Sequence, residues 1–186
     1  SNLLVSDAGF RGVILQIGPK MNRVTVEGNV IVAQAGASMA QIARTAMEHE
    51  LTGMEFASGI PGTIGGGVVM NAGAYGGELS QIVTQVNVVN NEGEIMELDN
   101  ETMEFGYRTS TIRNNPFTVT EVILRLEKGD RRQIRERMEE LAAKRREKQP
   151  LEYPSAGSTF KRPAGHYAGQ LIMEAGLRGF QCGGAK

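Results

Sequence analysis

The sequence has little cysteine, histidine and tryptophan for its length. Its 186 residues include one cysteine, Cys182, two histidines and no tryptophan. A single cysteine excludes an internal disulfide framework and is more typical of a reducing compartment, so we expect a cytoplasmic protein. One cysteine and two histidines are also a poor ligand set for structural zinc, and the sequence therefore predicts no metal site.

Strong charge of one sign and long apolar runs are missing as well. The formal net charge is -1, which gives no reason to expect nucleic acid or an anionic membrane as a partner. No apolar stretch approaches the roughly 18 residues that a membrane-spanning helix needs. The composition is 40% hydrophobic and 22% charged, which is typical of a globular chain that can bury its own core.

Short β-branched runs joined by turn residues dominate the first two thirds of the chain. Gly28-Asn29 and the segment Asn90–Gly93 each separate two such runs, which predicts two hairpins. A hairpin-rich chain with few helices predicts an α+β fold and not a doubly wound parallel sheet. The expected strands are Val13–Ile17, Arg23–Glu27, Val30–Ala35, Ile82–Val89, Glu94–Leu98 and Phe117–Leu126.

Three segments have helical periodicity. Ser38 with Gln41 three residues later predicts a capped helix start, and Gly53 is the expected C-cap of that helix. The segment Arg131–Lys148 predicts a long helix with Ile134, Met138 and Leu141 on its apolar face, and a short helix is expected over Ala168–Ala175. The long helix is the natural domain boundary. From Ala57 to Gly77 we expect little regular structure.

Glycine is concentrated in the segment Gly59-Ile60-Pro61-Gly62-Thr63-Ile64-Gly65-Gly66-Gly67. Glycine lets a ligand approach the backbone amides closely, and successive amides can form a concave site for a pyrophosphate. The segment is neither a Walker loop nor a Rossmann fingerprint, because both spacings are absent. On glycine content alone, a phosphate site and a tight loop without a ligand are equally good interpretations.

Four motifs in order extend this reading. The glycine segment is followed by Met70-Asn71-Ala72-Gly73-Ala74-Tyr75-Gly76-Gly77, and together they closely resemble the flavin loop of UDP-N-acetylenolpyruvoylglucosamine reductases. The start Ser1-Asn2-Leu3-Leu4 resembles the end of that family's first FAD motif. Tyr107-Arg108-Thr109-Ser110 resembles its Tyr-Arg motif, and Ala156-Gly157-Ser158-Thr159-Phe160-Lys161 resembles its Gly-Ser-x-Phe-Lys motif.

The resemblance implies a fold, a reaction and its cofactors. The fold would be an FAD-binding domain of the p-cresol methylhydroxylase type over residues 1–127, with its N-terminal part missing. A linker helix and the beginning of a smaller α+β substrate-binding domain would follow over residues 128–186, with the C-terminal part missing. The reaction would be NADPH-dependent, FAD-mediated reduction of UDP-N-acetylglucosamine enolpyruvate to UDP-N-acetylmuramate in peptidoglycan synthesis.

The resemblance also implies roles for individual residues. Arg108 would stabilise negative charge beside the substrate carboxylate, and Ser158 would donate a proton. The family's catalytic glutamate near the C-terminus has no counterpart here, which puts the activity of these 186 residues by themselves in doubt. The expected substrate-binding residues are Tyr75, Tyr107, Lys148 and Lys161. The expected FAD-binding residues are Ser1, Asn2, Leu3, Gly59, Ile60, Pro61, Gly62, Thr63, Gly65, Gly66, Asn71 and Gly73.

Two alternatives remain at the level of sequence. A different FAD oxidoreductase of the same fold is the nearest one, although many such oxidases tether FAD through His or Cys, which the flavin loops lack. A non-catalytic nucleotide-binding module is the second. Bound flavin, visible as a yellow protein, would exclude a plain interaction module. The sequence does not indicate an oligomeric state.

Overall fold

The computed structural model describes residues 3, 5–149 and 159–184. The chain divides into two compact units, residues 1–148 and 149–186. In the part of the chain that is described, no helix is both long enough and apolar enough to cross a membrane.

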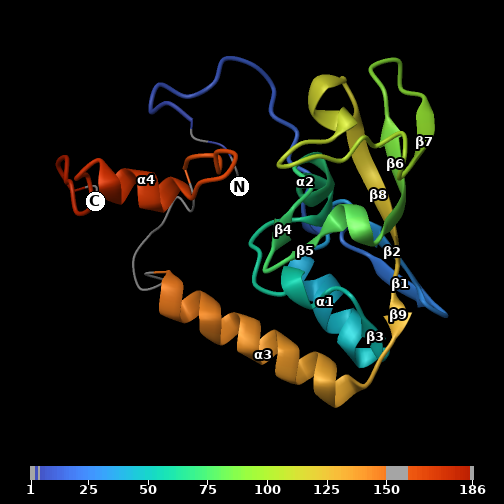
Figure 1. Ribbon diagram of the computed structural model, residues 1–186. Helices are drawn as coiled ribbons and strands as arrows, with labels where there is room; N and C mark the ends of the chain where they lie inside the picture. The colour runs from blue at the N-terminus through green and yellow to red at the C-terminus, as the bar shows by residue number, and fades with distance from the viewer. Residues whose placement is uncertain (1–2, 4, 150–158, 185–186) are drawn as a thin grey trace. The chain divides into compact units, whose positions relative to one another are not determined.

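A five-stranded antiparallel sheet forms the centre of the first unit (Figure 1). Every neighbouring pair in this sheet is antiparallel, so the predicted α+β class is confirmed, with antiparallel pairs in place of parallel β-α-β units. Across the sheet, the strands are β1 (Val24–Glu27), β2 (Val30–Gln34), β8 (Thr118–Arg125), β6 (Val83–Val89) and β7 (Ile95–Asp99).

Both hairpins form where the turn residues predict them. Gly28 takes a left-handed φ of 62° between β1 and β2, which a residue with a side chain would adopt at a cost. In the second turn, the side-chain oxygen of Asn90 accepts from the amides of Glu92 and Glu94, at 3.0 and 2.9 Å. Such an asparagine closes the turn through its own side chain.

The expected strand over Val13–Ile17 is wrong. This segment is irregular, and Val13, Ile14 and Leu15 are largely exposed. A strand needs a neighbour to satisfy its backbone, and none of the described residues pairs with the segment. Among the described residues, the first regular element of the chain is the 3-10 turn η1 (Pro19–Met21), which follows this segment.

Helix α1 (Met39–Glu48) starts as the sequence predicts and ends earlier. The Ser38 hydroxyl accepts from the Gln41 amide at 3.1 Å. The Gln41 side chain, however, donates to the carbonyl of Asn22 and does not complete the capping box. Gly53 is not the C-cap: His49 is, and Glu50 takes the left-handed φ of 57°, because the chain must turn at once into β3 (Leu51–Thr52), which pairs with β9 (Glu127–Lys128).

The glycine-rich segment is more regular than expected. It contains helix α2 (Ile64–Val69) and the short hairpin of β4 (Gly73–Ala74) and β5 (Gly77–Glu78). Three glycines in a six-residue helix oppose helix formation by about 1 kcal/mol each. Packing of α2 against the sheet overrides this preference. The 3-10 turns η2 (Glu55–Ala57), η3 (Leu79–Gln81) and η4 (Thr111–Asn114) complete the region.

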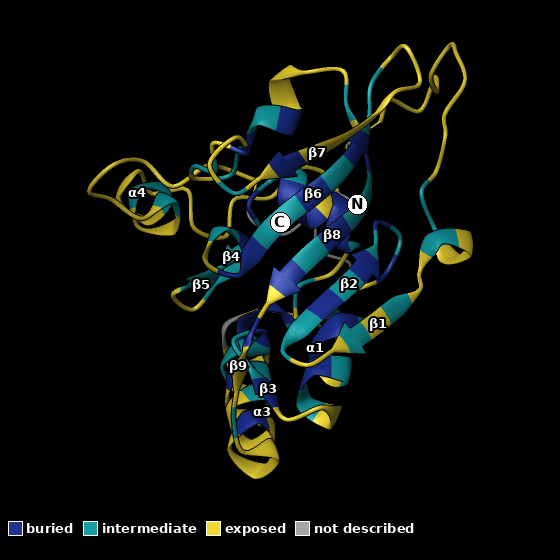
Figure 2. Ribbon diagram, turned by 90° about the vertical axis from the view of Figure 1, so that its right-hand side faces the viewer, coloured by how far each residue is buried: buried dark blue, intermediate teal, exposed yellow. Residues whose placement is uncertain are grey.

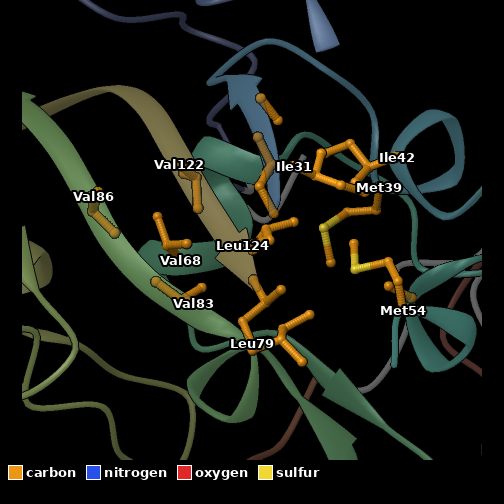
Figure 3. Packing of buried hydrophobic residues seen from close by; sticks show 14 of the residues in the cluster. Ile31, Met39, Ile42, Met54, Val68, Leu79, Val83, Val86, Val122 and Leu124 are labelled. Carbon is orange, nitrogen blue, oxygen red and sulfur yellow. The ribbon is translucent and has the colours of Figure 1, made fainter. Parts of the chain in front are cut away.

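The core lies between the sheet and the helices α1 and α2. Alternate residues of β2 are buried, and Figure 2 shows the strands side by side with buried and partly exposed residues alternating along them. Buried methionines fill the space between the elements, as the thioether side chain suits irregular gaps. Figure 3 labels the residues that meet there: Ile31, Met39, Ile42, Met54, Val68, Leu79, Val83, Val86, Val122 and Leu124.

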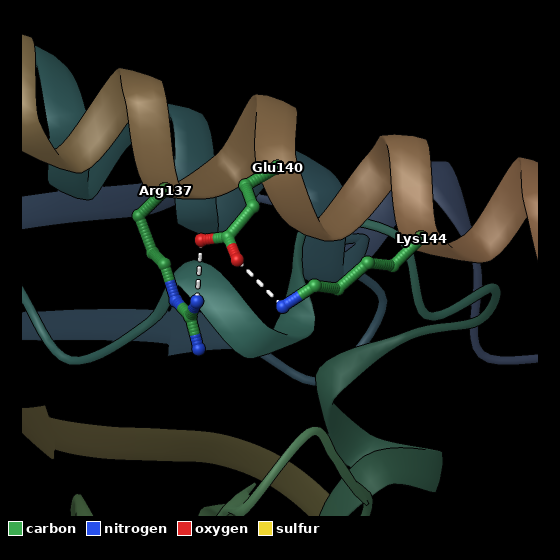
Figure 4. A network of polar contacts seen from close by, with 3 residues as sticks. All are labelled: Arg137, Glu140 and Lys144. Atoms are coloured by element: carbon green, nitrogen blue, oxygen red, sulfur yellow. Dashed lines mark hydrogen bonds and ion pairs between the residues drawn. The ribbon is translucent and has the colours of Figure 1, made fainter.

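Helix α3 (Arg131–Lys148) is confirmed. It packs on the rest of the first unit through Ile134 and Leu141, which are buried. Its opposite side carries charge. Glu140 accepts from Lys144 and from Arg137, both at 2.5 Å (Figure 4), and these two cations lower the pKa of the Glu140 carboxyl. The second unit contains α4 (Ala168–Glu174), also as predicted, closed by Gly176 with a left-handed φ of 71°.

Candidate functional site

The glycine segment 59–67 is attached to the chain that links β2 to α1. Ser38 and Thr63 form an antiparallel bridge. Next to it, the Met39 amide donates to the Gly62 carbonyl at 3.1 Å and the Ile64 amide donates to the Ala37 carbonyl at 2.8 Å. Since Ser38 caps α1 and Thr63 caps α2, two helix starts meet at this bridge. Helix starts carry partial positive charge and favour anions.

Some backbone amides of this segment donate hydrogen bonds within the described part of the protein, and others do not. The amides of Ile60, Ile64, Gly65 and Gly67 all donate to main-chain carbonyls. The amides of Gly59, Gly62 and Thr63 have no hydrogen-bond acceptor among the described residues. Unpaired amides next to two helix starts are a donor set that matches a diphosphate.

The glycines of this segment also differ in how much room surrounds their α-carbons. A Cβ added to Gly62 would meet no described atom within 4 Å, and one added to Gly66 would meet only the Thr63 hydroxyl at 3.8 Å. A Cβ on Gly65 would lie 2.8 Å from the Ala35 Cβ, and one on Gly67 would lie 3.0 Å from a Leu79 methyl. Packing therefore explains Gly65 and Gly67. It does not explain Gly62 and Gly66. Gly62 has a positive φ of 117°, which favours glycine, and both positions leave room for a ligand at the backbone.

Arg108 lies next to the second part of the predicted flavin loop. It sits at the tip of a tight hairpin in which Gly106 and Thr109 bond to each other through both amides, at 3.1 and 3.3 Å. Its guanidinium donates to the carbonyl of Gly73 at 2.9 Å and to that of Asn71 at 3.4 Å. The structure thus brings together three residues of the predicted site that are up to 37 positions apart in the sequence.

Tyr107 and Tyr75 flank this region on two turns. The Tyr107 ring lies with its centroid 5.3 Å from the Arg108 guanidinium carbon, a cation–π distance. Tyr75 and Gly76 connect β4 to β5 with left-handed φ values of 54° and 86°. This is the backbone of a tight hairpin turn in which asparagine or glycine usually occupies the first position. Tyrosine there is strained, and such strain is concentrated at functional sites.

Left-handed backbone at residues other than glycine occurs at five described positions. Three of them, Asn71, Tyr75 and Arg108, belong to the residues that the sequence assigned to the site. Each costs on the order of 1–3 kcal/mol unless the surroundings fix it. That these three positions share the feature supports a common role for the two turns and the segment between them.

Arg145 is a cation near the site that sequence reasoning missed. A Cβ on Gly59 would lie 3.2 Å from its Nη1 and 3.4 Å from its Cδ, so the Arg145 side chain covers the glycine directly. A signal was present: Arg145 continues the stripe of Ile134, Met138 and Leu141 by one further turn of α3. An arginine at the next position of an apolar stripe faces inward and not into solvent.

Several of the predicted site residues cannot be placed with the others. Ser1, Asn2 and Ser158 lie outside the described residues, as does the side chain of Lys148. Leu3 is described and exposed. Lys161 is exposed and belongs to the second unit, residues 149–186. The predicted pairing of Arg108 with Ser158 therefore remains a prediction. No group of three or more His, Cys, Asp or Glu side chains that could hold a metal ion occurs among the described residues.

Two parts of the chain match known sequence families. Residues 1–99 match the family described as FAD binding domain, and residues 149–186 match the family described as the C-terminal domain of UDP-N-acetylenolpyruvoylglucosamine reductase. The first match covers more than half of the chain. Together the two matches agree with the motif order found in the sequence.

Curated relatives match over the whole chain. UDP-N-acetylenolpyruvoylglucosamine reductases of Caldanaerobacter subterraneus and Clostridium kluyveri are 53% and 52% identical over 186 residues, which is 100% of this chain and 61% of each relative. A crystal structure of the reductase from Thermus caldophilus matches with a TM-score of 0.74 at 35% identity, covering 82% of this chain and 56% of that one. The chain thus spans about three fifths of the length of the relatives it matches.

Proposed function

Since the chain belongs to the FAD-binding domain family and resembles UDP-N-acetylenolpyruvoylglucosamine reductases over its whole length, we propose that it is part of an NADPH-dependent reductase of peptidoglycan synthesis. Its substrate would be UDP-N-acetylglucosamine enolpyruvate and its product UDP-N-acetylmuramate, made in the cytoplasm. The observation that carries the proposal is the attachment of the Arg108 hairpin to Asn71 and Gly73 of the flavin loop.

The glycine segment would hold the diphosphate of FAD. The unpaired amides of Gly59, Gly62 and Thr63 would donate to its oxygens, and the open backbone at Gly62 and Gly66 would allow the close approach. The Arg145 guanidinium beside Gly59 would add a positive charge. The remaining predicted FAD residues, Ser1, Asn2, Leu3, Ile60, Pro61 and Gly73, belong to the same proposal. Gly65 packs against Ala35 and the Asn71 side chain is bonded to Gly106 and Ser80, so these two would support the loop from inside the protein.

When bound, FAD would supply hydride transfer, accepting it from NADPH and passing it to the enolpyruvyl group. Arg108 would act on the substrate carboxylate, where negative charge grows during the reaction. Its two hydrogen bonds to the carbonyls of Asn71 and Gly73 hold the guanidinium in one orientation, and its remaining N–H groups, which have no acceptor among the described residues, would bind an anion. Donors that are fixed before the reaction stabilise such charge most effectively.

Ser158 would provide the proton that completes the reduction, since a carbanion is basic enough to take it from a hydroxyl. Tyr75, Tyr107, Lys148 and Lys161 would bind and orient the substrate, the lysines through its diphosphate or carboxylate. In this proposal residues 1–127 form the FAD-binding domain, and residues 128–186 form the linker helix and the beginning of the substrate-binding domain.

The complete reductase that contains this chain tests the proposal. Purified protein should be yellow, NADPH should bleach its flavin, and the enolpyruvyl substrate should restore the colour, as followed by absorbance in a stopped-flow instrument. A flavin that NADPH bleaches and only oxygen restores would favour another FAD oxidoreductase of this fold. Protein that binds no flavin would contradict the proposal.

Arg108→Ala gives the residue-level prediction. Because Arg108 acts where charge develops, the variant should slow reoxidation by the enolpyruvyl substrate about 100-fold and leave reduction by NADPH nearly unchanged. The control is Arg44→Ala, which removes an exposed arginine from α1. Equal losses in both half-reactions would instead indicate damage to FAD binding and would contradict the assigned role.

A further inference from the structure

Two buried polar side chains join the flavin loop to the Arg108 hairpin. Asn71 is 1% exposed and Ser110 is 2% exposed, and they are the two polar residues that are buried among those described. Asn71 donates from its side-chain Nδ2 to the Gly106 carbonyl at 3.2 Å, and Ser110 donates from Oγ to the Val69 carbonyl at 3.0 Å. Both bonds run between residues 69–71 and the hairpin, one on each side of Arg108.

Both ends of the Asn71 side-chain amide are bonded inside the protein. Besides the bond to Gly106, its Oδ1 accepts from the Ser80 amide at 2.9 Å. A buried amide that is satisfied at both ends is held in one orientation, and loss of either bond would leave an unpaired polar group in the core. These two bonds hold the Asn71 side chain between the Gly106 carbonyl and the Ser80 amide.

The connection between Asn71 and Arg108 runs in both directions. The Asn71 side chain holds Gly106, which forms the base of the hairpin, while Arg108 at the tip donates back to the Asn71 carbonyl at 3.4 Å. Asn71 itself has a left-handed φ of 41° and Arg108 one of 56°. Asparagine tolerates this backbone better than most residues, and it can offer both a donor and an acceptor from one short side chain.

We propose that Asn71, supported by Ser110, is a positioning residue that aims the Arg108 guanidinium, so that it serves the reaction through Arg108 and not by binding FAD with its side chain. This inference rests on the proposed function above. Its physical basis is that a catalytic side chain misplaced by about 1 Å can lose on the order of 100-fold in rate. Other hydrogen bonds that hold the hairpin come from the Thr111 amide, which donates to the Met103 carbonyl at 2.8 Å, and from the Arg113 guanidinium, which donates to the Arg108 carbonyl at 3.5 Å.

Asn71→Asp is the sharpest variant. Aspartate keeps an acceptor for the Ser80 amide and tolerates the left-handed backbone, but it places an oxygen against the Gly106 carbonyl where Nδ2 donated. The matched control is Asn90→Asp. The Asn90 Oδ1 accepts from the amides of Glu92 and Glu94 and its Nδ2 donates to the Glu94 carboxylate at 2.9 Å, so none of these bonds reaches Asn71 or the Arg108 hairpin.

In the complete reductase, Asn71→Asp should slow reoxidation by the enolpyruvyl substrate about tenfold or more while reduction by NADPH changes less than about twofold. Asn90→Asp should lower the melting temperature and leave the ratio of the two half-reaction rates as in the wild type. In an Arg108→Ala background, Asn71→Asp should change reoxidation by less than about twofold, because the residue that it aims is gone.

Three results would overturn the positioning role. Asn71→Asp could change both half-reactions by the same factor, it could leave reoxidation unchanged, or it could slow reoxidation by the same factor with and without Arg108. Asn71→Gly, which keeps the backbone and removes both side-chain bonds, replaces Asn71→Asp if the aspartate variant does not fold. A wild-type enzyme that the enolpyruvyl substrate does not reoxidise would contradict the proposed function itself, which separates the two failures.

Discussion

Gly65 and Gly66 are neighbours in the first turn of α2, yet they face opposite surroundings. Gly65 lies against β2, where a Cβ would come within 2.8 Å of the Ala35 Cβ and 3.0 Å of its carbonyl oxygen. Gly66 faces open space apart from the Thr63 hydroxyl at 3.8 Å. One glycine is needed so that the protein can pack, and we assign the other to ligand approach. Glycine thus occupies these two neighbouring positions for two different physical reasons.

Gly65→Ala should have the largest effect on stability. The neighbours of the new methyl group are the backbone and Cβ of Ala35, which cannot move aside as a flexible side chain can. Overpacking of this kind costs about 3 kcal/mol, and the better helix propensity of alanine offsets roughly 1 kcal/mol of it. A net loss of about 2 kcal/mol should appear in urea unfolding of the complete protein without flavin. A stability equal to the wild type would show that β2 and α2 are not packed this closely.

Gly66→Ala should weaken FAD binding without lowering the stability of the protein. Without a clash, alanine should leave the stability of the flavin-free protein unchanged or raise it by up to about 1 kcal/mol. If FAD lies over Gly66, the methyl group should weaken FAD binding about tenfold or more, equivalent to about 1.4 kcal/mol. Titration of the apoprotein with FAD, followed by quenching of flavin fluorescence, measures this. Unchanged affinity would remove Gly66 from the proposed site.

The sequence predicted the framework well and the internal structure of the glycine loop poorly. Hairpins at Gly28 and at Asn90–Gly93, the start of α1 at Ser38 and the whole of α3 followed from turn chemistry, capping and periodicity, which are local signals. Helix α2 could not be predicted because its glycines oppose helix formation. Burial of Ile64 and Val68 in the core and close packing of Gly65 and Gly67 on distant residues explain it. The same limit applied to Gly53, since the turn at Glu50 is set by the pairing of β3 with β9.

The candidate site shows a similar division. Motifs identified Arg108, Asn71 and Gly73 as site residues, and the structure brings them into contact. What the motifs did not indicate is how they act on one another: the Asn71 side chain is bonded to the hairpin and to Ser80. Arg145 was not among the predicted site residues, although its position continues the buried stripe of α3. Contacts between distant segments carry this information, and sequence spacing does not.

Gly59 is intermediate between Gly65, which packs against the protein, and Gly66, which faces open space. Its substitution should give the smallest effect of the three. Its added Cβ would meet a flexible side chain, at 3.2 Å from Arg145 Nη1, so Gly59→Ala should change stability by no more than about 0.5 kcal/mol. It should still weaken FAD binding a few-fold by displacing the guanidinium.

In an Arg145→Ala background the same substitution should have no further effect on FAD affinity, because residues that act through one contact are not additive. Arg146→Ala, at the exposed neighbouring position, is the control for loss of charge alone. Additive losses from Gly59→Ala and Arg145→Ala would mean that the two residues meet FAD independently, and Gly59 would then belong with Gly66.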